Sequence, residues 1–414
     1  MKKYLLCLLL IISLNVLIGM VPDTVVDIND IVEGSVSIRP IGDITGDGYD
    51  DILFFVNREF HPDGIERDIA LFAGNSLFEF SPSPLYSLPD TTGVIREISN
   101  IGDINNDGFN DFALGQPSFM DISRAFIYHG CPTLNFEEPA YVYSSISHDV
   151  GGFIIGLGDW NDDGHDDYVI SGVVPQRGFD LFSGIDPDEP YAVFENPYSS
   201  DFYSLGKVMV KADLDGDGRN ELYFGSVYSD SALYNLCVLK DFDEPIDTVL
   251  STNDLNILVN IYVVENIDGD RLLLEYECPI EFVTKYKILY LDEASSVFVS
   301  EDREFPYAPA DFVSASCFVS VGDLTGDGFS ELATIITRDE SSIMAVDIID
   351  NMRLVDRYEL LSSNYSLYTC DFNDDRIVEL LSVHSDQETS HTIIEIFTMG
   401  NSRRIEEKIP DETI

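Results

Sequence analysis

Five short stretches of the chain carry oxygen-bearing side chains at the same first, third, fifth and ninth positions, with a glycine sixth. These side chains are Asp43, Thr45, Asp47 and Asp51; Asp103, Asn105, Asp107 and Asp111; Asp159, Asn161, Asp163 and Asp167; Asp213, Asp215, Asp217 and Glu221; and Asp323, Thr325, Asp327 and Glu331. Alternate spacing turns the early oxygens toward one centre, and the carbonyl of the seventh residue can add another. Six or seven hard oxygens at about 2.3–2.6 Å suit calcium, whereas magnesium resists losing its waters to such a cage. We therefore expect structural calcium in these loops.

Two further copies of the loop depart from the pattern. The last copy keeps Asp371, Asn373, Asp375 and Glu379 but has Arg376 in place of the glycine. A left-handed conformation at an arginine costs roughly 1–2 kcal/mol, and the side chain adds a cation, so calcium binding there stays open. The other copy keeps Asn266, Asp268 and Asp270 but has Arg271 sixth and Leu274 ninth. We expect that copy to be empty, which predicts five or six calcium ions per chain.

The residues after the loops distinguish this pattern from an EF-hand. An EF-hand needs a bidentate glutamate at its twelfth position. That position holds Phe54, Leu114, Ile170, Phe224 and Thr334 in the five complete loops. The loops therefore lead into strands rather than helices, and their repetition in register argues against plain Asp-Gly turns.

The loops recur at intervals that define a repeat. They occupy 43–51, 103–111, 159–167, 213–221, 266–274, 323–331 and 371–379. Each unit carries an apolar run before its loop and β-rich runs after it, which indicates four short strands. Closing such sheets into a ring protects their edges. The sequence thus predicts an all-β, seven-bladed β-propeller with four antiparallel strands per blade, forming one domain over 20–414. We expect the chain ends to pair and close the ring, although the terminal strand that does so cannot be read.

The second unit carries a family resemblance. Its acidic loop leads into Asp111-Phe112-Ala113-Leu114-Gly115-Gln116-Pro117, which resembles the FG-GAP repeat of the propeller in integrin α subunits, where a calcium loop leads into a strand ending Gly-x-Pro. The third unit keeps a looser version in 171–175, and Leu205-Gly206 stands where the family has Phe-Gly. The resemblance covers about 34–400 and implies a calcium-bearing propeller. It says little about a partner.

The first residues have the layout of a secretory signal. Lys2 and Lys3 precede an apolar run over 4–18, which falls short of the ~20 residues of a spanning helix. We expect a signal peptide over 1–19 with cleavage near Met20, the alternative being an uncleaved N-terminal anchor. No cysteine follows the run as a lipid anchor requires, and no later stretch is long and apolar enough to cross a bilayer. The remainder is predicted to be secreted and, after signal removal, free of the membrane.

Composition narrows the classes of partner. The chain has 23 basic and 75 acidic residues, for a net charge of −52. Such a surface repels nucleic acid and anionic lipid and favours cations. The five cysteines after the signal are widely and irregularly spaced, so we expect small buried hydrophobic residues rather than a disulfide framework.

No catalytic motif stands out. None of the six histidines is in an HExxH or other paired metal spacing, and the chain has no GxSxG elbow and no phosphate-binding glycine loop. We expect a non-catalytic scaffold that binds an extracellular protein or glycan. Two alternatives remain: a carbohydrate-active propeller enzyme, such as a polysaccharide lyase or glycosidase, and a propeller lectin with aromatic stacking on sugars. The enzyme reading requires some of Tyr203, Lys207, Arg96, His148 and Tyr365 to meet in one channel-mouth pocket.

Overall fold

Strands are the building elements of this protein. The computed structural model describes residues 24–28, 35–61, 64–75, 86–87, 95, 97–117, 122–136, 138–145, 150–172, 178–194, 205–228, 233–241, 245–252, 257–266, 269–278, 283–292, 297–303, 314–337, 344–350, 353–360, 366–372, 377–385 and 391–399. All the regular elements over these residues are β-strands, and they form seven four-stranded antiparallel sheets. No helix in the described part of the chain has the length and apolarity to span a membrane.

The chain divides into two compact units. The larger unit comprises 30–304 with 371–375, and the smaller unit comprises 1–29, 305–370 and 376–414. The larger unit holds five sheets, whose strands are β2 (Ser35–Gly42), β3 (Asp51–His61), β4 (Gly64–Phe72) and β5 (Tyr86–Ser87); β6 (Glu97–Gly102), β7 (Asp111–Gln116), β8 (Ser123–Tyr128) and β9 (Tyr141–Ser145); β10 (Phe153–Gly158), β11 (Asp167–Ser171), β12 (Phe179–Phe182) and β13 (Ala192–Phe194); β14 (Leu205–Ala212), β15 (Glu221–Tyr228), β16 (Leu233–Leu239) and β17 (Asp247–Thr252); and β18 (Ile257–Val264), β19 (Arg271–Cys278), β20 (Val283–Asp292) and β21 (Val297–Arg303).

The smaller unit holds two sheets of the same kind. Their strands are β22 (Ser314–Ser320), β23 (Leu332–Thr337), β24 (Met344–Asp350) and β25 (Arg353–Leu360); and β26 (Ser366–Cys370), β27 (Glu379–Ser385), β28 (Thr392–Thr398) and β1 (Thr24–Asp27). Strand β1 pairs antiparallel with β28, from Thr24 opposite Ile396 to Asp27 opposite Ile393. The N-terminal strand is thus the fourth strand of the last sheet, a point that the sequence left open.

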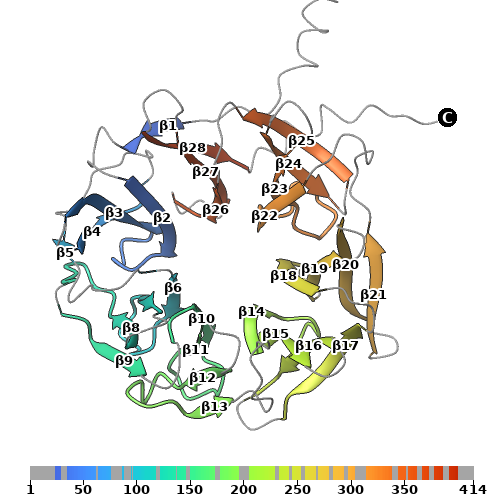
Figure 1. Ribbon diagram of the computed structural model, residues 1–414, viewed down its shortest axis with the longest axis horizontal. Helices are drawn as coiled ribbons and strands as arrows, with labels where there is room; N and C mark the ends of the chain where they lie inside the picture. Colours follow the sequence, from blue (N-terminus) through green and yellow to red (C-terminus); the bar gives the residue numbers. More distant parts are fainter. Residues whose placement is uncertain are drawn as a thin grey trace, which may run out of the picture. The chain divides into compact units, whose positions relative to one another are not determined.

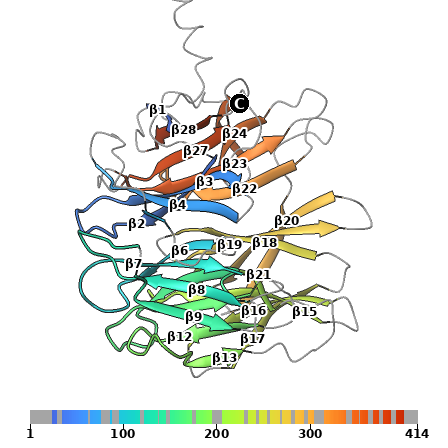
Figure 2. The ribbon, with the colours of Figure 1, turned by 60° about the vertical axis from the view of Figure 1, so that its left-hand side comes forward.

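Within the larger unit the five sheets follow one another in chain order. Their first strands, β2, β6, β10, β14 and β18, contact one another in that order. Figure 1 shows each sheet of this unit running outward from its first strand to its fourth. Figure 2 shows β12 and β13 beside β8 and β9, and residues of these two sheets share one hydrophobic cluster. Four-stranded antiparallel sheets packed in this way form a β-propeller, which confirms the predicted fold class. Closure of seven blades into one ring stays a prediction.

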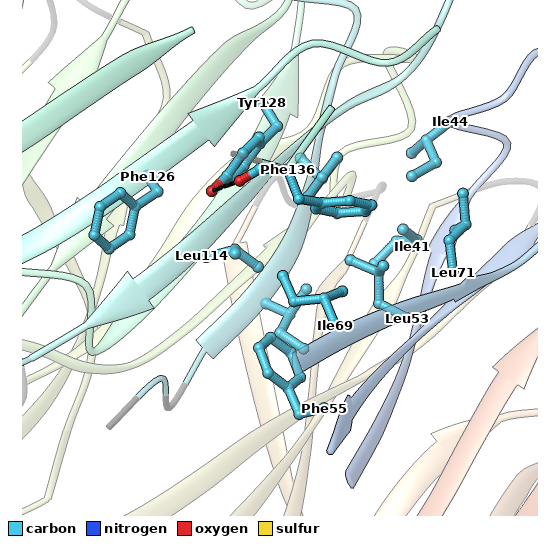
Figure 3. Close-up of a cluster of buried hydrophobic side chains, with 12 residues drawn as sticks. Ile41, Ile44, Leu53, Phe55, Ile69, Leu71, Leu114, Phe126, Tyr128 and Phe136 are labelled. Carbon is cyan, nitrogen blue, oxygen red and sulfur yellow. Dashed lines mark hydrogen bonds between the residues drawn. The ribbon is translucent and has the colours of Figure 1, made fainter. Parts of the chain in front are cut away.

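The hydrophobic core lies between neighbouring sheets. In the cluster between the first and second sheets, Leu53, Leu71 and Ile69 of one sheet lie together with Leu114 and Phe126 of the other (Figure 3). The inner strands bury both faces, so β7 is buried at all six positions, whereas β13 is partly or fully exposed. This explains why the second strand of each unit reads as a continuous apolar run instead of an alternating one.

Aromatic pairs add to the same interface. The rings of Phe112 and Tyr128 stack with their centroids 5.1 Å apart, and Phe136 packs 5.8 Å from each. Such pairs contribute about 0.5–1.5 kcal/mol each beyond the burial of their area. Cys237 and Cys370 are buried and free, as expected of small hydrophobic residues on strands, whereas Cys131 is half-buried and free and lies outside the strands.

Candidate metal centres

Each complete loop joins the first and second strands of its sheet. The residue before the loop pairs with the ninth loop residue, as Gly42 does with Asp51 and Ala212 with Glu221. The same pairing is seen for Gly102 with Asp111 and for Gly158 with Asp167. This confirms the predicted place of the loops at the first turn of the four-stranded repeat.

The first-position aspartate organises the loop by accepting backbone N–H groups. Asp43 accepts from the amides of Gly46 at 2.6 Å, Asp47 at 3.0 Å and Gly48 at 2.8 Å. The amide of Tyr49 then donates to Asp47 Oδ1 at 3.1 Å. Equivalent bonds to the first and fifth positions occur in the loops that begin at Asp103, Asp159, Asp213 and Asp323. Both carboxylates are therefore held over the turn with oxygens directed into it.

Two positions of every complete loop have positive φ. The sixth position is the predicted glycine, with φ of 87° to 94°. The fourth position also lies in the left-handed region, at Gly46, Asn106, Asp162, Gly216 and Gly326. Glycine, asparagine and aspartate are the residue types that tolerate this region best. The restriction to these types at the fourth position was therefore present in the sequence, although we did not predict its role.

The ninth-position acid is buried and bonded to backbone amides. Asp167 is fully buried and accepts from Trp160 N at 2.9 Å, Asn161 N at 3.2 Å and Gly184 N at 3.1 Å. Asp51 and Asp111 are bonded in the same way. Each of these three aspartates thus ties its own loop to the end of the third strand of its sheet.

A glycine after the third strand was missed by sequence reasoning. Gly74, Gly130 and Gly184 donate their N–H to the ninth aspartate of the first three loops. A Cβ at any of them would overlap the carbonyl oxygen of the eighth loop residue. The available pattern was a glycine two residues after a buried aromatic residue, as in Phe72-Ala73-Gly74.

The two loops that end in glutamate differ from the other three in how closely their acidic side chains converge. The side chains of Asp213, Asp215, Asp217 and Glu221 each offer an oxygen within 4.8 Å of the others, and Asp323, Asp327 and Glu331 do the same. Two oxygens on opposite sides of a calcium ion at about 2.4 Å are about 4.8 Å apart. Both sets are therefore close enough together to hold one metal ion. Among the described carboxylates these are the two groups of three or more that converge so closely.

In the three loops that end in aspartate, neutral oxygens stand beside the carboxylates. Asn105 Oδ1 accepts from Asp107 N at 3.0 Å, and Asn161 Oδ1 accepts from Asp163 N at 2.9 Å. Thr45 lies at the same position, with its amide bonded to Asp51 at 2.9 Å. The side-chain oxygens of Asn105 and Asn161 thus face the backbone of their own loops, and the role of the third position as a metal ligand stays a prediction.

Burial strongly perturbs the ninth-position acids. Desolvation raises the pKa of Asp51 to about 7, against backbone hydrogen bonds from Thr45 and Gly74 that lower it. Desolvation likewise raises the pKa of Asp167 to about 6 and that of Glu221 to about 7, and it raises the pKa of Asp111. A buried carboxylate of this kind is stabilised in its ionised form by an adjacent cation.

The incomplete copy of the loop, predicted at 266–274, has different bounds in the structure. Val264 pairs with Arg271, so the loop spans only 265–270 and Leu274 is not its ninth residue. Arg271 stands where the other loops have the buried acid, because strand pairing sets the register and the loop is two residues shorter. The expected emptiness of this copy agrees with a cation at that place. Asp268 lies outside the described residues.

Asp270 has a structural role instead. Its Oδ2 accepts from Asp213 N at 3.0 Å, its Oδ1 accepts from Asn266 N at 3.1 Å, and its own N–H donates to Asp213 O at 2.6 Å. Asp166, the eighth residue of the third loop, makes the same reciprocal pair with Asp103 at 2.8 and 3.2 Å. Neighbouring loops are thereby tied together.

Several predicted residues lie outside the described part of the chain. In the last loop Asp371 is half-buried and Glu379 is fully buried at the start of β27, while Asn373, Asp375 and Arg376 are among the residues not described. The expected signal peptide over 1–19 is also outside. So are Tyr203, Arg96, His148 and Tyr365, together with the side chain of Lys207, and the enzyme alternative therefore stays untested.

Comparisons with known proteins point to one family. The chain is 30% identical to integrin alpha-6 of Homo sapiens over 131 residues, which cover 31% of this chain and 11% of that protein. It is 31% identical to integrin alpha-8 of Mus musculus over 114 residues, covering 26% and 11%, and 28% identical to integrin alpha-PS2 of Drosophila melanogaster over 116 residues, covering 25% and 8%. The chain thus spans about a tenth of the length of these relatives. No family model matches it. The repeated loops, the four-stranded sheets and this similarity together identify the chain as an integrin-α-like β-propeller protein of the FG-GAP type.

Proposed function

We propose that the chain is a secreted, non-catalytic, calcium-binding β-propeller that acts as an extracellular adhesion or ligand-binding scaffold. The observation that carries the proposal is the convergence of Asp213, Asp215, Asp217 and Glu221 within 4.8 Å. Their oxygens are placed by a loop whose backbone amides are bonded to the first and ninth acids. The same loop plan recurs at 43–51, 103–111, 159–167 and 323–331.

Calcium has a structural task in this proposal. Each loop joins two strands and carries several carboxylates that repel one another without a cation, and burying an unpaired charge is costly. A bound ion would hold the ninth acid ionised and rigidify the turn. Stabilisation then grows with calcium concentration by mass action, which suits an extracellular medium rich in calcium. Five or six ions per chain are proposed, with the last loop open.

Similarity to integrin α subunits supports the scaffold role. The partner proposed here is an extracellular protein or glycan rather than nucleic acid. The net charge of −52 opposes binding to polyanions. Secretion is proposed from the N-terminal residues.

A binding screen with two metal states tests this function. The mature protein is immobilised and exposed to a glycan array and to a panel of purified extracellular proteins, once with calcium and once with chelator. We expect binding of at least one ligand that is lost in chelator, and no degradation of the glycans. Release of unsaturated or reducing sugar ends from any glycan would contradict the non-catalytic assignment.

The matched variant for the screen is Asp217→Asn. It removes one charge from the converging set of the fourth loop and keeps the shape of the side chain. If ligand binding is retained in chelator and is unchanged in this variant, ligand binding does not depend on calcium, which would contradict this part of the proposal.

A further inference from the structure

A polar pocket of about 540 Å³ lies in the larger unit, where the first strands of four successive sheets approach the metal loops. Strands β2, β6, β10 and β14 all contribute to its lining, as do Asn110 and Asp166, the eighth residues of the second and third loops. Pockets for small molecules typically measure about 300–1,000 Å³. The volume therefore suits a ligand of a few ring atoms with substituents.

Two of the polar side chains in this pocket are held by backbone groups. Asn100 Oδ1 accepts from Gly102 N at 2.7 Å, which leaves its amide nitrogen as the free donor end. Asp166 Oδ2 accepts from Asp103 N at 2.8 Å. Glycine at position 102 is needed for this arrangement, because a Cβ there would overlap Asp166 Oδ2. Donors and acceptors fixed in advance lose little entropy when a ligand binds.

A second amide donor lies close to the first. A Cβ built on Gly42 would lie 3.3 Å from Asn110 Nδ2 and closer still to Asn100 Nδ2, so both amide nitrogens flank the same glycine. Ile98, Ile155 and Pro40 supply apolar surface beside these groups. The lining thus combines amide donors, one carboxylate and an apolar wall.

Lys211 of β14 supplies the positive charge. It lines the pocket, where burial lowers the pKa of its ammonium group and the neighbouring Asp166 carboxylate acts in the opposite direction. Among the described residues it forms no ion pair within 4.0 Å, in a chain that has 75 acidic and 23 basic residues. Asp166 uses one of its oxygens on Asp103, so the ammonium group is available to an anionic ligand.

We propose that this pocket binds a small hydroxylated monocarboxylate, namely a single sugar acid of the uronate class. Lys211 pairs with the ligand carboxylate, Asn100 and Asn110 donate to ligand oxygens, and the Asp166 carboxylate accepts from hydroxyl groups. Asp166 would repel a dianion such as phosphate, which favours a single negative charge with hydroxyl groups beside it. The inference goes beyond the proposed function, which assigns no ligand site.

The test is a ligand-observed NMR titration of the mature protein in calcium buffer with glucuronate, glucose and acetate. Glucose lacks the carboxylate and acetate lacks the hydroxyl groups. We expect glucuronate to bind at least tenfold more tightly than either. Equal binding of acetate or glucose, or no binding of glucuronate, would overturn the assignment. The calcium-induced change in melting temperature is measured on the same sample, so a failure of the calcium proposal is seen separately.

Three variants locate the site. Lys211→Met removes the charge and should weaken glucuronate binding at least tenfold. Lys287→Met makes the same change on β20, where Lys287 forms an ion pair with Asp302 of β21, and should have no effect. Asn110→Asp is compatible with the fold, because Asp50 and Asp166 occupy the same eighth position in neighbouring loops. It adds a carboxylate to the pocket and should weaken glucuronate while glucose is unchanged. Glucuronate binding that is unaffected in both pocket variants would refute the site.

Discussion

In the absence of calcium, the free energy of unfolding of this protein should fall as the pH rises from about 5.5 to about 8. The ninth-position acids are the cause. With no cation beside them, burial raises the pKa of Asp51 from 3.8 to about 7, that of Asp167 from 3.8 to about 6 and that of Glu221 from 4.5 to about 7. A raised pKa in the folded state gives stability that is fully present below the unfolded pKa. That stability is lost as the pH rises through the folded pKa.

The size of the effect follows from the shifts. The folded pKa lies about 1.5 pH units above pH 5.5 for Asp51 and Glu221 and about 0.5 unit above it for Asp167. Each unit corresponds to about 1.36 kcal/mol. The three acids together contribute about 5 kcal/mol over this range. If about 400 residues unfold together, the melting temperature should fall by roughly 6 °C. Ordinary carboxylates are already ionised at pH 5.5 and add little.

Differential scanning calorimetry at the two pH values, with chelator and with excess calcium, measures this effect. In the proposed sites calcium would bind the ionised acids, so the pH dependence should largely disappear in its presence. Asp51→Asn should remove about 2 kcal/mol of the chelated dependence, whereas Asp302→Asn, at an exposed acid whose pKa is lowered by Lys287, should leave it unchanged. A chelated protein that is equally or more stable at pH 8 would refute the reasoning.

Three further predictions concern single residues. Gly184→Ala should destabilise the protein by about 1–3 kcal/mol in urea unfolding, because its Cβ would overlap Asp166 O and lie 2.8 Å from Ile104 O; an unchanged midpoint would contradict the close approach. Asp270→Ala should lower the free energy of unfolding by about 1–3 kcal/mol through its lost bonds to Asp213, with an unchanged calcium count by calorimetric titration. Asp163→Ala should remove one calcium site and reduce the calcium-dependent gain in melting temperature, and a full calcium count in this variant would contradict its role as a ligand.

The strands and the loop positions could be predicted because both depend on local pattern. An apolar run such as Ile52-Leu53-Phe54-Phe55 must be buried on both faces, and the repeat fixes how many strands each unit holds. The positive φ of Gly48 was predictable for the same reason, since a turn of this kind needs glycine.

Contacts between distant residues could not be predicted in this way. Gly74 donates to Asp51 from 23 residues away, and its role depends on where the third strand ends. The fifth loop was aligned on Asn266, Asp268 and Asp270, but the register of Val264 with Arg271 shows a loop shortened by two residues. Strand pairing settles such a register, and a short acidic motif does not.

The polar pocket was also beyond sequence reasoning. Asn100, Asp166 and Lys211 come from three different sheets, and only the packing of successive first strands brings them together. A lone lysine in a sequence of this charge is more often a solvated side chain, so residue type alone gave no reason to select it.

Calorimetric titration of chelator-stripped protein with calcium tests the central claim most directly. The loop geometry predicts five or six calcium ions per chain, weak competition by magnesium and a rise in melting temperature on calcium binding. A protein that binds no calcium, and whose melting temperature is the same in calcium and in chelator, would contradict it and leave the loops as turns.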